Sequence, residues 1–226
     1  MNRFQKCLGF VLLAGTALTR SQTADSSALP LYLQNRNYPL QIGLYQLYRT
    51  NKTDIVMLGN SITFGVDWNE LLGRSTVVNR GISSDVTEGY IHRLDFVYNL
   101  HPHLCFIMAG INDLYANVQL QTVFQNYRTI VEELQAHQIV PIIQSTLYVS
   151  SRWKRSRAKN LEVERLNQLL HAYADDHHLN FIDLNALMSG DRLLKEELTY
   201  DGLHLNAGGY AIWAHEVEKV LQQYGL

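Results

Sequence analysis

Cysteine, proline and charged side chains are all scarce in this chain of 226 residues, of which only 18% are charged. It has two cysteines, Cys7 near the N-terminus and Cys105 inside an apolar run, which excludes a disulfide framework and a cysteine-based metal site. Its four prolines are dispersed and no low-complexity tract occurs, so nothing marks an interdomain linker. A formal net charge of −2 gives no overall field that would attract nucleic acid, and we expect a small-molecule partner.

The chain also lacks an apolar run of the length that a transmembrane helix needs. Its N-terminus instead has Arg3 and Lys6, an apolar stretch at residues 7–18 and then a polar segment, which is the pattern of an export signal. We therefore expect residues 1–24 to be a signal peptide and residues 25–226 to be the mature domain. The protein would be periplasmic or secreted, with no stable membrane span after signal removal. An uncleaved anchor or a buried helix is the alternative interpretation.

The mature chain alternates short apolar runs with longer segments of helical periodicity, which is typical of parallel strands joined by crossover helices. The predicted strands are residues 54–58, 76–79, 104–109, 139–146 and 180–184. The predicted helices are residues 88–100, 119–137, 157–177 and 209–224. This pattern predicts a three-layer α/β domain, in which ligands bind beyond the carboxyl ends of the strands.

Ser61 stands just after the first predicted strand, behind Gly59 and Asn60. A serine on such a turn can supply an attacking hydroxyl, and its own N–H can stabilise the oxyanion that results. Taken alone, Ser61 is better explained as an ordinary helix cap, since serine is favoured there.

Asp201 and His204 lie close to the C-terminus and are separated by two residues. In a turn, this spacing brings both side chains to one side, so the carboxylate can orient the imidazole while its other nitrogen takes a proton from a serine. The alternative is a turn capped by Asp201 with His204 as a surface residue.

Gly81 and Asn112 follow the second and third predicted strands. The side-chain amide of Asn112 and the N–H of Gly81 could both donate to a developing oxyanion. An Asx turn and a loop glycine are the corresponding structural explanations. Four such features at the ends of successive elements nevertheless favour one shared site.

These segments together resemble the SGNH (GDSL-like) hydrolases, acetylesterase-like bacterial members in particular. The resemblance spans about residues 54–222, and four blocks carry it in family order: Gly59-Asn60-Ser61-Ile62-Thr63, Gly81, Gly110-Ile111-Asn112-Asp113 and Asp201-Gly202-Leu203-His204. It implies a flavodoxin-like five-stranded parallel sheet, no metal and no cofactor. It also implies Ser61 as nucleophile, His204 as base, Asp201 as its partner, and an oxyanion hole of Ser61, Gly81 and Asn112. Asn60 departs from the aspartate of the name-giving motif, which bears on loop geometry rather than on the chemistry.

The function that follows is hydrolysis of short-chain esters through an acyl-enzyme on Ser61. Because no long insertion could form a lid or acyl tunnel, we expect acetyl esters, those of O-acetylated carbohydrate such as sialic acid among them. A lysophospholipase or arylesterase using the same residues is the alternative within the enzyme class. A non-catalytic carbohydrate-binding protein on the same fold is the alternative outside it.

Two further groups of residues carry weaker signals. A basic cluster follows the fourth predicted strand and surrounds Trp153; it consists of Arg152, Lys154, Arg155, Arg157 and Lys159. It is explained either as a solvated start of a helix or as a surface that attracts an acidic sugar. Four histidines precede predicted strands without the spacing of metal ligands: His101, His103, His177 and His178.

Overall fold

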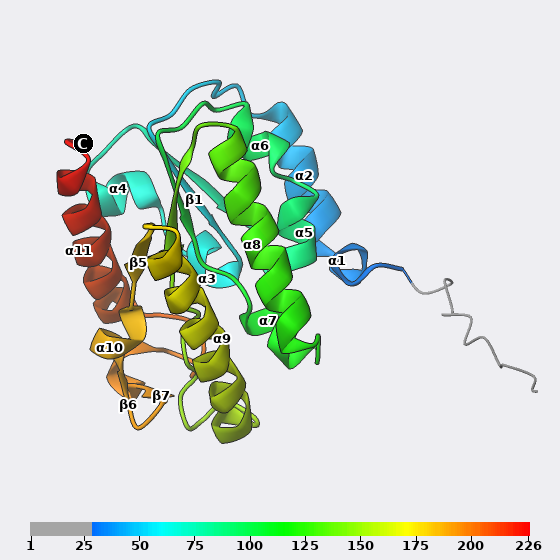
Figure 1. Cartoon of the computed structure of the whole chain (residues 1–226), viewed down its shortest axis with the longest axis vertical. Coiled ribbons are helices and arrows are strands. Elements are labelled where there is room, and N and C mark those ends of the chain that lie inside the picture. Colours follow the sequence, from blue (N-terminus) through cyan, green and yellow to red (C-terminus); the bar gives the residue numbers. More distant parts are fainter. Residues whose placement is uncertain (1–28) are drawn as a thin grey trace, which may run out of the picture.

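The computed structural model describes residues 29–226, and the expected signal peptide lies outside the described residues. Five parallel strands form one sheet in the order β2-β1-β3-β4-β5 (Figure 1). They are β1 (Ile55–Gly59), β2 (Val77–Gly81), β3 (Leu104–Ile107), β4 (Val140–Gln144) and β5 (Asn180–Ile182). This strand order is that of the flavodoxin-like folds, so the prediction of a three-layer α/β/α fold with a five-stranded parallel sheet is confirmed.

Helices cover both faces of the sheet (Figure 1). One face carries α4 (Trp68–Leu72), α10 (Leu184–Met188) and α11 (Ala207–Gln223). The other face carries α5 (Thr87–Ile91), α8 (Leu120–Ala136) and α9 (Ser156–Asp176). Because both faces are covered, all five residues of β1 are buried, as expected for a central parallel strand.

Several shorter elements complete the described chain. Before the sheet come α1 (Leu31–Gln34) and α2 (Asn37–Leu47). Between strands lie α3 (Ser61–Phe64), α6 (Asp95–Tyr98) and α7 (Ile111–Tyr115). An antiparallel hairpin of β6 (Ser189–Gly190) and β7 (Leu193–Leu194) and a 3-10 helix, η1 (Glu196–Leu198), precede α11.

The sequence located the strands to within two residues at each end, and three of the four predicted helices as closely. Residues 88–100 were wrongly predicted as one helix. The structure has α5 and α6 there, because the chain tightens at residues 92–94 and turns the Arg93 side chain into the interior, where it is fully buried. The apolar face of α8 is buried at Val123, Tyr127 and Ile130, which follow helical spacing.

The edge of the sheet at β2 is capped by side chains. The Val77 N–H donates to Asn69 Oδ1 at 3.1 Å, and the Gly81 N–H donates to Asn79 Oδ1 at 2.8 Å. The Gly81 carbonyl accepts from the Tyr45 hydroxyl at 2.9 Å. Because these outward-facing N–H and carbonyl groups already have hydrogen-bond partners, the edge of the sheet is protected from pairing with a strand of another chain.

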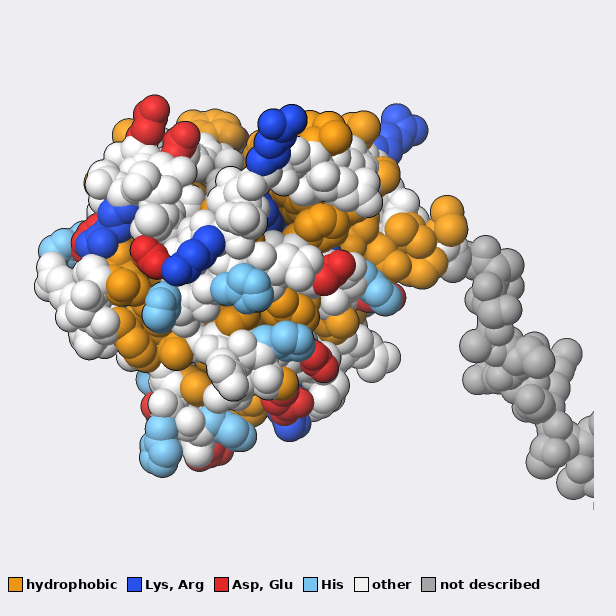
Figure 2. Space-filling view, turned by 90° about the horizontal axis from the view of Figure 1, so that it is seen from above, with side chains coloured by type: hydrophobic (Ala, Val, Ile, Leu, Met, Phe, Trp, Pro, Cys, Tyr) orange, Lys and Arg blue, Asp and Glu red, His pale blue; other side chains and the backbone are white. Residues whose placement is uncertain are grey.

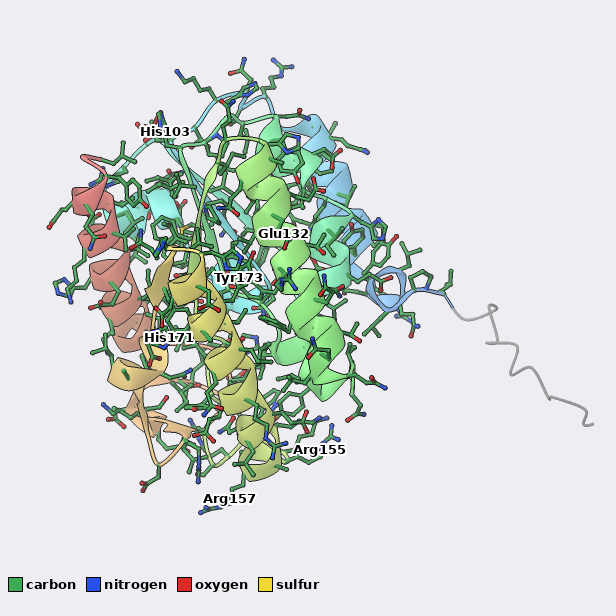
Figure 3. All side chains as sticks on the ribbon, viewed as in Figure 1. His103, Glu132, Arg155, Arg157, His171 and Tyr173 are labelled. Carbon is green, nitrogen blue, oxygen red and sulfur yellow. The ribbon has the colours of Figure 1, made fainter. Side chains whose placement is uncertain are left out.

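The two ends of the sheet differ in what they carry. Figure 3 places His103 at the end where the strands begin, and Arg155 and Arg157 at the opposite end, near the start of α9. Viewed from the side of His103, side chains of both charges and several histidines are interspersed, with no patch of one sign (Figure 2). Among residues 29–226, no helix combines the length and the apolar character that crossing a bilayer requires.

Candidate active site

Ser61 is the first residue of α3, two residues beyond the end of the interior strand β1. The preceding Asn60 caps this helix, because its Oδ1 accepts from the Ile62 N–H at 3.0 Å. Asn60, and not Ser61, therefore caps this helix. The asparagine thus maintains the loop geometry at the position where the family motif has an aspartate. The Ile62 carbonyl accepts from the Tyr210 hydroxyl at 2.7 Å, which ties α3 to α11.

The structure brings His204 and Asp201 to Ser61. The His204 Nε2 lies 3.0 Å from Ser61 Oγ, and the His204 Nδ1 lies 2.6 Å from Asp201 Oδ2. Three side chains from the two ends of the chain thus form one continuous series of hydrogen bonds. This series has the arrangement of a nucleophile, a base and a group that fixes the tautomer of the base.

Asp201 also organises its own loop. Its Oδ1 accepts from the N–H groups of Leu203 at 2.9 Å and His204 at 2.8 Å, so it caps a turn and orients the imidazole at the same time. Burial raises the pKa of this carboxyl, but the hydrogen bonds from the His204 ring and from these N–H groups outweigh burial and leave the pKa lowered. The carboxylate therefore stays ionised beside His204. The exposed ring of Tyr200 stacks on the His204 imidazole at 5.8 Å between centroids.

Asn112 lies on α7, just after β3, and its amide is oriented by the loop that follows β2. Its Nδ2 donates to the Asp85 carbonyl at 2.8 Å. A primary amide carries two N–H bonds, so one remains for a ligand. Gly110 precedes the helix at a φ of 106°, where a residue with a side chain would be strained.

The structure does not leave the Gly81 N–H available for an oxyanion. This N–H donates to Asn79 Oδ1, and a Cβ at Gly81 would lie 2.4 Å from the Phe64 nitrogen. Gly81 is required because α3 packs directly on β2 at this point. The expected role of Gly81 as an oxyanion donor is therefore corrected to a packing role.

Ser84 offers the N–H that Gly81 does not. It follows the end of β2 by three residues, in a turn closed by the Asp85 N–H donating to the Ile82 carbonyl at 3.1 Å. Its φ of 63° is unusual for a residue with a side chain, and its N–H has no acceptor among residues 29–226. Sequence reasoning missed Ser84, since no glycine marked the left-handed position and only the turn geometry shows the N–H to be free.

Comparison with known proteins identifies the family of this domain. Residues 57–212 match the GDSL-like Lipase/Acylhydrolase family. The chain belongs to this family. Membership supports esterase or acylhydrolase activity and confirms the resemblance on which the sequence-based prediction rested.

Solved structures of this family share the fold. A GDSL-like lipase from Bacteroides thetaiotaomicron is 25% identical with a TM-score of 0.73, covering 83% of this chain and 98% of that one. A lipase/acylhydrolase from Enterococcus faecalis is 25% identical with a TM-score of 0.67, covering 76% and 96%. An acetyl xylan esterase, 18% identical with a TM-score of 0.64 and covering 74% and 97%, shows the fold alone.

Curated relatives are longer proteins. The N-acylneuraminate cytidylyltransferase of Streptococcus agalactiae serotype V is 25% identical over 142 residues, which are 59% of this chain and 34% of the relative. The enzyme of serotype III is 27% identical over 99 residues, 44% of this chain and 23% of the relative. The chain therefore spans at most about a third of the length of these relatives.

A buried arginine links the strand ends of this GDSL-like domain. Arg93 Nε donates to Asp85 Oδ2 at 2.8 Å, Nη1 donates to the Arg80 carbonyl at 2.7 Å, and Nη2 donates to the Gly59 carbonyl at 3.0 Å. One guanidinium thus joins the strand before Ser61 to the turn that carries Ser84. The sequence alone did not single out this arginine, because only the broken helix turns it inward.

Asp113 supports the loop that holds Asn112. Its Oδ1 accepts from the Thr87 hydroxyl at 2.5 Å and from the Thr87 N–H at 3.0 Å. These bonds join α7 to α5 beneath the site. Burial raises the pKa of Asp113 to about 6, against the lowering effect of the Thr87 hydrogen bonds.

Three residues of the basic cluster contact other parts of the protein. Arg152 pairs with Glu196, and the buried Lys159 pairs with Glu162 at 2.9 Å. Arg155 lies over the Tyr115 ring at 5.6 Å. Lys159 therefore supports the segment after β4 from inside, whereas Arg152, Lys154, Arg155 and Arg157 are exposed, and a surface that attracts an acidic sugar stays a prediction.

No group of three or more metal-ligating side chains is assembled within residues 29–226. His103 lies at the end of the sheet where the strands begin (Figure 3), whereas Ser61 follows the carboxyl end of β1. The prediction that no metal or cofactor is needed stays a prediction.

Proposed function

We propose that this protein is a serine esterase that hydrolyses short-chain esters, acetyl esters above all, through an acyl-enzyme on Ser61. The observation that carries the proposal is the series of hydrogen bonds from Asp201 through His204 to Ser61. Membership of the GDSL-like family supports the reaction class. A protein that only binds carbohydrate has no need of a base aligned on a serine.

In the proposed reaction, Ser61 Oγ attacks the ester carbonyl while His204 Nε2 takes its proton. Asp201 holds the Nδ1–H tautomer and stabilises the imidazolium. The C–O bond to the alcohol then breaks, and His204 returns the proton to the leaving oxygen. A water molecule repeats these steps on the acyl-enzyme and releases the acid.

Three donors would stabilise the oxyanion of the tetrahedral intermediate: the N–H groups of Ser61 and Ser84 and the free Nδ2–H of Asn112. The Ser61 N–H lies in the first turn of α3 and has no acceptor among the described residues. Losing one donor of this kind typically raises the barrier by about 3 kcal/mol.

We further propose that the natural substrate is an O-acetylated carbohydrate, with an O-acetylated sialic acid as the first candidate. The names of the curated relatives refer to N-acylneuraminate, which is a sialic acid. The proposal that residues 1–24 export the protein would place it where acetylated glycans occur.

The test of the catalytic assignment is acetate release from p-nitrophenyl acetate. We expect Ser61→Ala to lower kcat at least 10³-fold, because the nucleophile is lost. Ser75→Ala is the matched control, since Ser75 is an exposed serine whose hydroxyl has no hydrogen bond within residues 29–226. Equal rates for the wild type and Ser61→Ala would leave a non-catalytic carbohydrate-binding protein as the better explanation.

The test of the substrate compares O-acetylated sialic acids, acetylated xylan fragments and lysophospholipids under the same conditions. We expect the acetylated sialic acids to have the highest kcat/KM. Efficient release of long-chain fatty acid from lysophospholipids, with acetylated sugars untouched, would favour a lysophospholipase.

A further inference from the structure

A small cavity of about 280 Å³ lies beside two of the proposed oxyanion donors, Ser84 and Asn112. Its remaining wall includes Leu31 from α1, Val86 from the loop after β2 and Ala116 at the end of α7. The volume is below the range of pockets that enclose drug-sized ligands, about 300–1,000 Å³. The cavity therefore suits a small group attached to the reacting carbonyl.

One wall of the cavity comes from outside the part of the chain that matches the family, which begins at residue 57. Helix α1 is fixed there by specific contacts. Asn35 Nδ2 donates to the Ser83 carbonyl at 2.8 Å, and the Tyr32 ring stacks on His92 at 4.6 Å between centroids. The chain thus adds a fixed wall next to the turn that carries Ser84.

The polar side chains of this wall already have partners. Gln34 Nε2 donates to the Leu29 carbonyl at 2.7 Å, and Asn35 donates to Ser83 and accepts from the Asn37 N–H at 3.0 Å. What the wall offers a ligand is chiefly the carbon surface of Leu31. An apolar group gains more from such a surface than a hydroxylated sugar ring does.

The position of His204 decides which part of an ester meets this cavity. The leaving oxygen must lie within reach of His204 Nε2, since that nitrogen protonates it. His204 arrives from the loop before α11, whereas α1 packs on α5, which covers the opposite face of the sheet. The alcohol therefore lies on the α11 side, and the group on the α1 side is the acyl group.

We propose that this cavity is the acyl site and that Leu31 of α1 limits the length of the acyl chain. The inference rests on the proposed esterase function and deepens it. It assigns to the segment before the family domain a part in substrate selection. A short acyl chain fits between Leu31 and Ala116, and a longer chain meets the α1 wall.

The experiment measures kcat/KM for p-nitrophenyl acetate, butyrate and octanoate, so that only the acyl chain varies. Leu31→Ala should raise the butyrate-to-acetate ratio about tenfold, and Ala116→Leu should lower it by a similar factor, because methylene contacts in an apolar pocket discriminate on this scale. Leu33→Ala is the matched control. Leu33 lies on the same helix, is 44% exposed and does not line the cavity.

The outcomes separate this inference from the proposed function. Ser61-dependent hydrolysis with chain-length ratios within twofold of the wild type in both variants would overturn the acyl site alone. The variants could instead change the preference among acetates of different alcohols while the chain-length ratios stay unchanged. That result would assign the cavity to the alcohol and would also overturn the acyl site. Absence of Ser61-dependent hydrolysis in the wild type would overturn the esterase function, and the acyl site with it.

Discussion

Arg93 and Asp85 form an ion pair at 2.8 Å in which both side chains are fully buried. The same guanidinium donates to the carbonyl of Gly59, two residues before the proposed nucleophile. Asp85 follows Ser84, and its carbonyl accepts from Asn112. The pair therefore fixes the relative position of the nucleophile and two of the proposed oxyanion donors.

Replacing Arg93 by methionine should destabilise the protein by about 3–5 kcal/mol, because Asp85 is left as an unpaired buried charge. Urea unfolding measures this loss. Arg74→Met is the control, since its pair with Glu218 is about 30% exposed and should contribute at most about 1 kcal/mol. The double variant Arg93→Met/Asp85→Leu should recover part of the loss, and no recovery would argue that the uncompensated charge is not the cause.

Asp201→Asn should lower kcat for p-nitrophenyl acetate by about 10³- to 10⁴-fold while the fold is retained. The amide can present an N–H to His204 Nδ1 and so favour the tautomer that cannot take the Ser61 proton. Circular dichroism of the variant checks the fold. A loss below tenfold would mean that Asp201 mainly shapes its turn through the N–H groups of Leu203 and His204.

Ser84→Gly should keep esterase activity and raise the free energy of unfolding by about 1 kcal/mol, because glycine adopts a φ of 63° without strain. The proposed role belongs to the backbone N–H, which glycine retains. Activity and urea unfolding measured on one preparation test both parts. A large loss of kcat in Ser84→Gly would assign the role to the hydroxyl instead.

Gly81→Ala should be destabilising, since its Cβ would lie 2.4 Å from the Phe64 nitrogen and the backbone of α3 would have to shift. We expect a loss of stability of about 1–3 kcal/mol, measured by urea unfolding. Full stability in this variant would contradict the close packing of α3 on β2.

Asp113 should make stability depend on pH. Its pKa of about 6 lies above its ordinary value of 3.8, so the folded protein keeps a proton that the unfolded chain releases. This contribution is fully present below pH 4 and is lost as the pH rises to about 6, a change on the order of 3 kcal/mol. Unfolding measured from pH 4 to 7 should show that Asp113→Asn lacks this decline. Parallel curves for the two proteins would contradict it.

Local patterns in the sequence were enough for the strands and the long helices. Apolar runs such as β1 are buried whatever surrounds them, and the helical stripe of α8 has one face that must be covered. Residues 88–100 were mispredicted as one helix because the Arg93 side chain turns into the interior and interrupts the helical periodicity. Arg93 has its partners in Gly59, Arg80 and Asp85, none of which a helical pattern can reveal.

The sequence by itself determined which residues can do chemistry: a serine after a strand, an aspartate two residues before a leucine-histidine pair, and an asparagine after another strand. Only the tertiary structure decided which backbone N–H groups are free to act as oxyanion donors beside these residues. The N–H of Gly81 is taken by Asn79, and that of Ser84 is left free by a turn with positive φ. The chemistry of a side chain follows from its residue type, whereas the availability of a backbone N–H depends on the neighbours that the fold brings to it.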